Sequence, residues 1–276
     1  MPFKTIMLGL IVEDEAVPAN VSEYALAFSS AERSHLACRI LAPLVDLPTG
    51  RLLPLVKAMV DQVNDERSAR AREIAGKLAS SGALSGVGVD ARVIEEPYAV
   101  ARAELIDASR ASDLVILPQS KGVLSFEAGL VEGVLFGSGR PVLVVPAEWE
   151  RGRRLKHVVV AWDGGARSAR AVGDALPLLA QAEEVEVVCV AEENKRSVPG
   201  VELAEHLARH CKKVRLTDLP ITHDDAGWTL RDHLDSVSAD LLVMGAYAHA
   251  RFMQFVFGGV TSQMLTCANL PVFYSY

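Results

Sequence analysis

The sequence predicts an α/β protein with two similar domains in tandem, each built on a five-stranded, parallel, doubly wound sheet. Three observations support this class. Short apolar runs alternate with amphipathic segments along the chain, the same plan occurs twice, and each half ends in an apolar strand that opens with proline. Strands that alternate with helices imply right-handed crossovers and a parallel sheet with helices on both faces.

The first half is expected to contain five strands and four helices. The strands are short and nearly all apolar: Lys4–Val12, Leu36–Val45, Val87–Glu95, Asp113–Pro118 and Pro141–Pro146. The helices are expected at Ala16–Glu32, Leu52–Leu84, Tyr98–Ala111 and Glu127–Phe136. In the longest helix the apolar residues recur at helical spacing from Leu52, and Gly82 marks the predicted end.

The second half repeats this plan after a short charged linker, Trp149–Arg154, which gives predicted domains at 1–148 and 153–276. Its strands are expected at Leu155–Ala161, Val185–Ala191, Val214–Leu219, Asp240–Gly245 and Leu270–Ser275. Its helices are expected at Ser168–Ala182, Val201–Cys211, Gly227–Ser238 and Ser262–Ala268. This is the pattern of an internal duplication. Because terminal strands need cover, the last strands of the two halves are expected to pair with each other.

Composition limits the classes of function. The chain has 276 residues, half of them hydrophobic, and a net charge of −7, which argues against a general electrostatic grip on nucleic acid or anionic membrane. The N-terminus lacks a signal-peptide pattern, and no apolar run is long enough to span a bilayer. The four cysteines are scattered without CxxC spacing, so the expected compartment is the cytoplasm.

The strongest functional signal is the stretch Leu241–Ser262. An apolar strand stops at Gly245, and about a dozen residues later the chain reaches Gly258-Gly259-Val260-Thr261 and a helix. Glycines at a strand end and a helix start let backbone N–H groups approach a polyphosphate, and the helix N-terminus favours negative charge. The alternative is that these glycines serve only turns and packing.

The sequence resembles the universal stress protein family in its tandem two-domain form. The resemblance rests on Val158–Gly164, Met244–His249 and Phe257–Thr261. The family motif is glycine, two residues, glycine, nine residues, glycine, then serine, threonine or a second glycine. The chain keeps the nine-residue spacing, from His249 to Phe257, but has Ala248 where the family has its second glycine. The resemblance implies flavodoxin-like domains, of the adenine nucleotide alpha hydrolase-like type, that bind ATP or AMP at the carboxyl ends of the strands.

Carried over residue by residue, the resemblance implies a nucleotide site in the second half. Ala161 and Asp163 would border adenine and ribose, and Val190 and Met244 would line the base pocket. Ribose and phosphates would be held by Gly245, Gly258, Gly259, Val260 and Thr261. Ala248 and His249 lie in the same loop. His249 and Arg251 either donate to phosphate or form a solvated rim. If position 248 needs φ > 0, alanine there costs on the order of 1 kcal/mol and weakens affinity about tenfold or less.

The first half serves as an internal comparison. Aligned on the shared last strand and on the first strand, it has Val131 in place of Thr261, Ile11 in place of Asp163 and Pro118 in place of Gly245. A hydroxyl, a carboxylate and a backbone N–H are thereby lost. We therefore expect only the second half to bind nucleotide, and we expect that the lost residues are not needed for the fold. Correspondingly, Gly258→Val should abolish nucleotide-induced stabilisation, and Gly129→Val should leave it unchanged.

Other candidate sites are weaker. His206 and His210 have a zinc-compatible spacing but no third ligand at a diagnostic distance, so no metal site is expected. His223-Asp224-Asp225 could touch a ligand or magnesium, but the favoured interpretation is a polar loop in which an aspartate caps the next helix. No Ser–His–Asp order, P-loop or phosphate-clamping lysine is readable, so no catalytic residue is assigned and enzyme activity is not favoured.

The leading hypothesis is a stress-response protein that binds ATP or AMP, with or without Mg²⁺, and acts as a nucleotide-dependent regulatory module. Its partner would be a protein of unknown identity rather than nucleic acid or membrane. Two alternatives stay open: a slow Mg-dependent ATPase that uses Asp163 or Asp224, and an interaction protein that has lost nucleotide binding. The duplication is compatible with a monomer that forms an internal pseudo-dimer, or with a homodimer.

Overall fold

The computed structural model describes residues 3–13, 17–45, 54–120, 122, 125–191, 200–222, 225–246 and 259–276. The first half contains β1 Thr5–Ile11, α1 Ala19–Glu32, β2 His35–Leu41, α2 Pro54–Ser85, β3 Val89–Ile94, α3 Tyr98–Ser109, β4 Leu114–Pro118, α4 Phe126–Gly137 and β5 Val142–Val145. The second half contains β6 His157–Ala161, α5 Ala166–Leu179, β7 Glu184–Ala191, α6 Gly200–Leu207, β8 Val214–Pro220, α7 Ala226–Ser236, β9 Leu241–Gly245, α8 Gly259–Cys267 and β10 Val272–Ser275.

Every element expected from the sequence is present, and the differences lie at boundaries. Helix α2 runs past Gly82 to Ser85 and is followed by Gly86, whose φ of +69° suits a helix end. Gly82 instead lets the helix lie close to β3, since a Cβ there would be 2.2 Å from Val89 Cγ2. Helix α8 begins at Gly259 rather than at Ser262, so Gly259, Val260 and Thr261 lie in its first turn.

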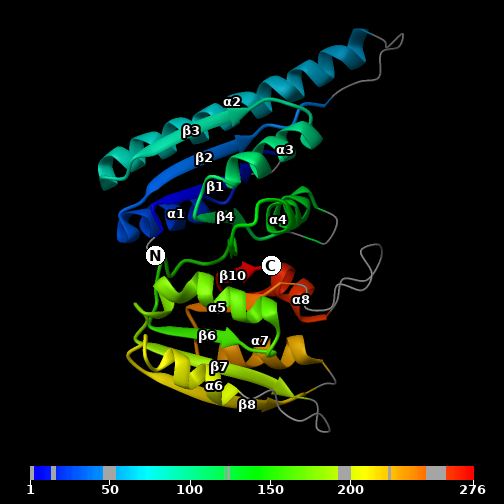
Figure 1. Ribbon diagram of the computed structural model, residues 1–276. Helices are drawn as coiled ribbons and strands as arrows, with labels where there is room; N and C mark the ends of the chain where they lie inside the picture. The colour runs from blue at the N-terminus through cyan, green and yellow to red at the C-terminus, as the bar shows by residue number, and fades with distance from the viewer. Residues whose placement is uncertain are drawn as a thin grey trace.

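The strands form a single sheet in the order β3-β2-β1-β4-β5-β10-β9-β6-β7-β8 (Figure 1). Each half has the order 3-2-1-4-5 with parallel neighbours, so the doubly wound prediction is confirmed. Strand β10 pairs antiparallel with β5, with Tyr274 opposite Val142 and Val272 opposite Val144. The expected pairing of the two last strands is therefore also confirmed. None of the helices described is both long and apolar enough to cross a membrane.

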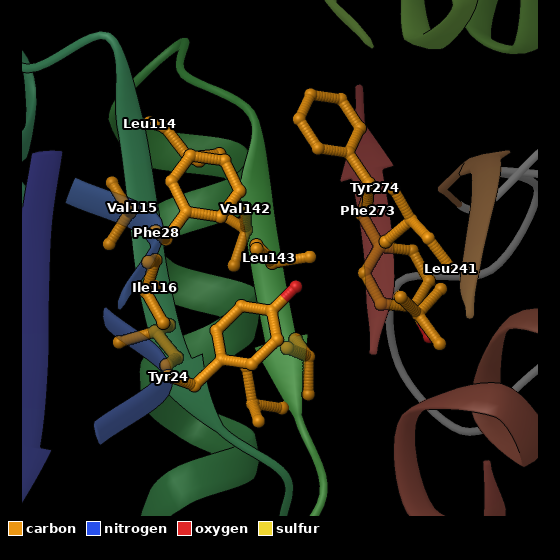
Figure 2. Close-up of a cluster of buried hydrophobic side chains, with 14 of the residues drawn as sticks. Tyr24, Phe28, Leu114, Val115, Ile116, Val142, Leu143, Leu241, Phe273 and Tyr274 are labelled. Atoms are coloured by element: carbon orange, nitrogen blue, oxygen red, sulfur yellow. The ribbon is translucent and has the colours of Figure 1, made fainter. Parts of the chain in front are cut away.

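The core follows the sheet across this junction. Strands β4 and β5 are buried along their whole length, as is β10. Figure 2 shows Tyr24 and Phe28 of α1 beside side chains of β4 and β5, and Phe273 and Tyr274 of β10 beside Leu241 of β9. Burying each large apolar side chain contributes roughly 1.5–3 kcal/mol, so the junction is an apolar core rather than a hinge.

One buried ion pair links the two halves beside this core. Arg153 donates through Nη2 to Glu32 Oε1 on α1 and to Gln181 Oε1 at 2.7 Å, and Gln181 Nε2 donates to Glu32 at 2.9 Å. The Glu32 side chain is only 4% exposed, and the Arg153 guanidinium also lies over the Phe28 ring. The three polar side chains hydrogen-bond to one another where α1 of the first half faces the second half, while the buried Nε of Arg153 has no partner among the described residues.

Replacing Arg153 with methionine should lower the free energy of unfolding by about 3 kcal/mol, because the buried Glu32 carboxylate loses its cation. Arg170→Met is the matched control: Arg170 pairs with Asp174 but its side chain is 53% exposed, so its loss should cost less than about 1 kcal/mol. Urea denaturation of both variants measures the difference. Equal losses would show that the ion pair between the halves contributes no more than a surface pair.

Candidate functional site

The second half has one topological switch point, between β6 and β9. At this point Ala161 pairs with Met244. The chain leaves the two strands toward different helices, from β6 to α5 and from β9 to α8. On one face of the sheet, Ser275 of β10 donates to Asp174 of α5. On the other face, Glu186 of β7 contacts α7, which packs against α8. Open α/β sheets bind ligands in the crevice that such an arrangement leaves at the carboxyl ends.

The apolar residues predicted for the base pocket lie together at this edge. Ala161 lies between Val188 of β7 and Met244 of β9, and Val190 lies two residues after Val188 on β7. In a parallel sheet paired residues point to the same face, so all four point toward α7 and α8. Ala161 and Val190 are only partly buried. The edge thus offers an apolar surface that the chain itself does not fully cover.

Asp163 lies in the exposed loop that follows β6. Its Oδ1 accepts hydrogen bonds from Gly165 N at 2.8 Å and from Ser168 Oγ at 2.6 Å. Gly164 has φ of +73°, which glycine adopts without strain. The turn interpretation of Asp163 therefore holds for Oδ1. Among the residues that the structure describes, Oδ2 has no hydrogen-bond partner, so one carboxylate oxygen is left for a ligand.

The first turn of α8 carries Gly259, Val260 and Thr261. Thr261 is buried and Val260 is partly buried. This turn contains no acidic residue, so nothing within it offsets the positive end of the helix dipole. The predicted residues Gly258, Ala248 and His249 lie outside the described residues, as do Arg251, His223 and Asp224.

Helix α8 is tied to the start of α7 through Gln263 and Asp225, a link that the sequence did not reveal. Asp225 caps α7 by accepting from Gly227 N at 2.7 Å and Trp228 N at 3.0 Å. Its other oxygen accepts from Gln263 Nε2 of α8 at 2.9 Å. The capping interpretation of this loop is therefore confirmed for Asp225. Hydrogen bonds from Trp228, Gln263 and Gly227 outweigh burial and lower the pKa of the Asp225 carboxyl.

A second polar cluster anchors α7 to the sheet below the edge. Buried Glu186 accepts from Thr217 Oγ1 at 2.6 Å and Arg215 Nη2 at 2.7 Å, and His233 Nε2 of α7 lies 3.1 Å from it. His157 Nε2 lies 2.9 Å from the same carboxylate. Burial raises the pKa of Glu186, but the hydrogen bonds from Thr217 and Arg215 outweigh it, so the pKa lies below its usual value. The residues described hold no cluster of three or more metal-ligating side chains. His206 and His210 are near neighbours, with ring centroids 5.0 Å apart.

Gly245 has a packing role that the sequence comparison missed. A Cβ at this position would lie 2.6 Å from Ser168 N and 2.7 Å from the carbonyl carbon of Arg167, both in the first turn of α5. The expectation that Gly245 is not needed for the fold is therefore wrong for the second half. The first half tolerates Pro118 there because its own helix α1 begins further along the chain, at Ala19, after a longer connection from β1.

The equivalent crevice of the first half is filled by its own side chains. A Cβ on Gly9, which corresponds to Ala161, would lie 2.6 Å from Leu117 Cδ2 and 3.0 Å from Leu105 Cδ2. In the first turn of α4, Glu127 is buried and its Oε2 has no hydrogen-bond partner. The space beside Gly129 is occupied by Tyr98, because a Cβ added to Gly129 would lie 2.5 Å from the Tyr98 hydroxyl. Gly129→Val would therefore disturb the contact with Tyr98, and its expected lack of effect on nucleotide-induced stabilisation stays a prediction.

Two buried donors without acceptors lie near the second-half edge and were not assigned from the sequence. Trp162 Nε1 and Arg167 Nη1 are both buried, and the described residues give neither a hydrogen-bond partner. Trp162 sits between Ala161 and Asp163, and Arg167 lies in the first turn of α5. An arginine just after Gly164-Gly165 was the available sequence signal. The sequence does not show whether a carboxylate packs against this arginine, because that depends on residues that are distant along the chain.

Gly245→Ala should lower the free energy of unfolding by about 1–3 kcal/mol, because its methyl group would overlap the start of α5. Gly173→Ala, in the middle of α5, is the control, since an added Cβ there meets nothing within 4 Å. It should instead stabilise the protein by up to about 1 kcal/mol. Chemical denaturation distinguishes them, and a neutral Gly245→Ala would remove the packing explanation.

Asp225→Ala should cost about 1 kcal/mol near neutral pH, because α7 loses its cap. The folded pKa of Asp225 lies below its unfolded value, so the charged contribution is present above the unfolded pKa of about 3.9 and is lost as pH falls through the folded pKa. The difference in free energy of unfolding between wild type and Asp225→Ala, measured by urea titration, should therefore become smaller from about pH 7 to about pH 3. A gap that widens with acid would contradict this assignment.

Comparison with protein families matches residues 154–274 to the universal stress protein family. No curated protein sequence matches the chain significantly. Among solved structures, a universal stress protein from Archaeoglobus fulgidus has a TM-score of 0.73 at 18% identity, covering 97% of this chain and 95% of its own. A functionally unknown protein from Pseudomonas aeruginosa has a TM-score of 0.59 at 13% identity, covering 99% and 92%. Residues 154–274 therefore match the universal stress protein family, and the two halves together share the fold of these solved structures.

Proposed function

We propose that this protein is a stress-response binding module that takes an adenine nucleotide, ATP or AMP, in the β6–β9 crevice of its second half. The observation that supports the proposal is that three suitable groups lie on the elements that border one switch point. They are the partly buried apolar surface around Ala161, the Asp163 carboxylate and the uncompensated N-terminus of α8. They occur in the half that matches the family.

Each group suits one part of a nucleotide. Ala161, Val190 and Met244 offer an apolar surface for a base, on which burial of the ring is favourable. The unpaired Oδ2 of Asp163 can accept a hydrogen bond from a ribose hydroxyl. The first turn of α8, with Gly259 and Thr261, supplies backbone N–H groups and a positive field for phosphate.

The first half is proposed not to bind nucleotide. Leu117 and Leu105 occupy the space beside Gly9, so a base would have to displace packed side chains. At the start of α4, the buried Glu127 carboxylate places a negative charge where a phosphate would need a positive field. Both features oppose binding, one by packing and the other by charge.

The proposed mechanism is occupancy rather than turnover. A nucleotide at the first turn of α8 would bias the position of this helix, and the Gln263–Asp225 hydrogen bond passes that bias to the start of α7. There, Trp228 is 45% exposed and lies beneath the Arg231 guanidinium. We propose that a protein partner reads this surface, and that the partner distinguishes occupied from empty protein.

The first experiment is denaturation of purified protein, followed by chromatography of any released AMP or ATP. Thermal unfolding with millimolar nucleotide, with and without Mg²⁺, complements it because a ligand that binds only the folded state raises the melting temperature. An empty site together with no thermal shift would reject the proposal. Sustained phosphate release from ATP and Mg²⁺ would favour the alternative of a slow ATPase.

Asp163→Asn separates the two roles of this residue. Asparagine keeps the oxygen that accepts from Gly165 and Ser168, so unfolding free energy should change by less than about 0.5 kcal/mol. Loss of the charged acceptor should weaken nucleotide affinity about tenfold or more. Asp163→Ala should lose both, with an added stability cost of about 1 kcal/mol. Calorimetry and urea titration give the two readouts, and undiminished affinity in Asp163→Asn would remove the ribose role.

A further inference from the structure

Arg167 lies where α5 meets the ends of β9 and β10. An added Cβ on Gly245 would lie 3.0 Å from Arg167 Cβ, so the arginine side chain starts directly beside the last residue of β9. Its guanidinium carbon is 4.1 Å from the centroid of the Tyr276 ring. Tyr276 follows Ser275, which pairs with Gly245. The guanidinium is therefore held at the carboxyl ends of β9 and β10.

This guanidinium differs from three other arginines of the second half, which pair with carboxylates. Arg153 pairs with Glu32, Arg215 with Glu186 and Arg170 with Asp174. Within the part of the chain that the structure describes, Arg167 has no carboxylate partner, and its Nη1 is buried without any acceptor. A buried cationic donor without an acceptor is costly, and native proteins usually supply a partner.

The Asp163 carboxylate lies at the start of α5, where it accepts from Gly165 N and Ser168 Oγ, but among the described residues no ion pair joins it to Arg167. The first turn of α5 contains no acidic residue, and its N-cap is Gly165, which has no side chain to accept from the first N–H groups. In the first half, by contrast, three acidic residues follow β1 in succession: Glu13, Asp14 and Glu15. Asp163 offsets part of the positive end of α5, whereas the Arg167 guanidinium has no carboxylate partner among the described residues and so favours an anion.

We propose that Arg167 is an additional ligand-binding residue that receives the phosphate end of the nucleotide. This proposal rests on the function proposed above and adds a residue outside the glycine motif. Stacking on Tyr276 pre-organises the planar guanidinium, so little rotamer freedom is lost when two of its N–H groups meet phosphate oxygens. The base would then lie toward Ala161 and Val190 and the phosphates toward Arg167 and the first turn of α8.

The test compares adenosine, AMP and ATP on wild type, Arg167→Met and Arg170→Met by calorimetry. Methionine keeps an apolar side chain against Tyr276 while removing the charge. Loss of a charge-assisted hydrogen bond to phosphate should weaken AMP and ATP binding about tenfold to a hundredfold and leave adenosine unchanged. Arg170→Met, one turn along the same helix, should bind all three as wild type does. The affinity of wild type for AMP, but not for adenosine, should also fall with added salt.

The outcomes separate this proposal from the one on which it rests. If wild type binds nucleotide and Arg167→Met binds AMP equally well, or loses AMP and adenosine alike, Arg167 does not bind phosphate and the nucleotide site stands. If wild type binds no nucleotide, the proposed function fails and inorganic pyrophosphate becomes the probe. Pyrophosphate binding that Arg167→Met abolishes would support an anion site at Arg167, and its absence in wild type would overturn it.

Discussion

The antiparallel pairing of β5 with β10 is the constraint on which the rest of the structure depends. It occupies the edge that each parallel sheet would otherwise expose, and so joins two five-stranded sheets into one of ten strands. Because β4 runs parallel to β5 and β9 runs parallel to β10, the strands of the two halves run in opposite directions where the halves meet. Each half keeps its own switch point, between β1 and β4 in the first half and between β6 and β9 in the second.

The same arrangement brings contacts between the halves to both faces of the sheet. Arg153, Glu32 and Gln181 meet on the side of α1 and α5, and Gln119 Nε2 donates to the carbonyl oxygen of Ala268 at the end of α8. Burial of Phe273 and Tyr274 from β10 against the core closes the junction between them (Figure 2). Helix α8 thus touches the first half at one end and carries the proposed phosphate site at the other.

Several residues at the proposed site serve the fold and the ligand at once. Asp163 stabilises the loop before α5 with one oxygen, and Gly245 allows α5 to approach β9. A loss of binding after simple truncation would therefore be ambiguous. Asp163→Asn and Arg167→Met are informative because each removes a charge while keeping most of the local packing.

The sequence by itself determined the fold class, the duplication, the positions of all eighteen elements and the pairing of the last strands. Apolar periodicity and the proline-led repeat carry that information because they are local or recur along the chain. The family resemblance also predicted that Ala161, Asp163, Val190 and Met244 lie near one another at the carboxyl ends of the strands. Only the tertiary structure decided three features: the close contact of Gly245 with α5, the packing of Leu117 beside Gly9, and the buried Nη1 of Arg167 that has no acceptor among the described residues. These depend on distances between residues far apart in sequence, which no local pattern encodes.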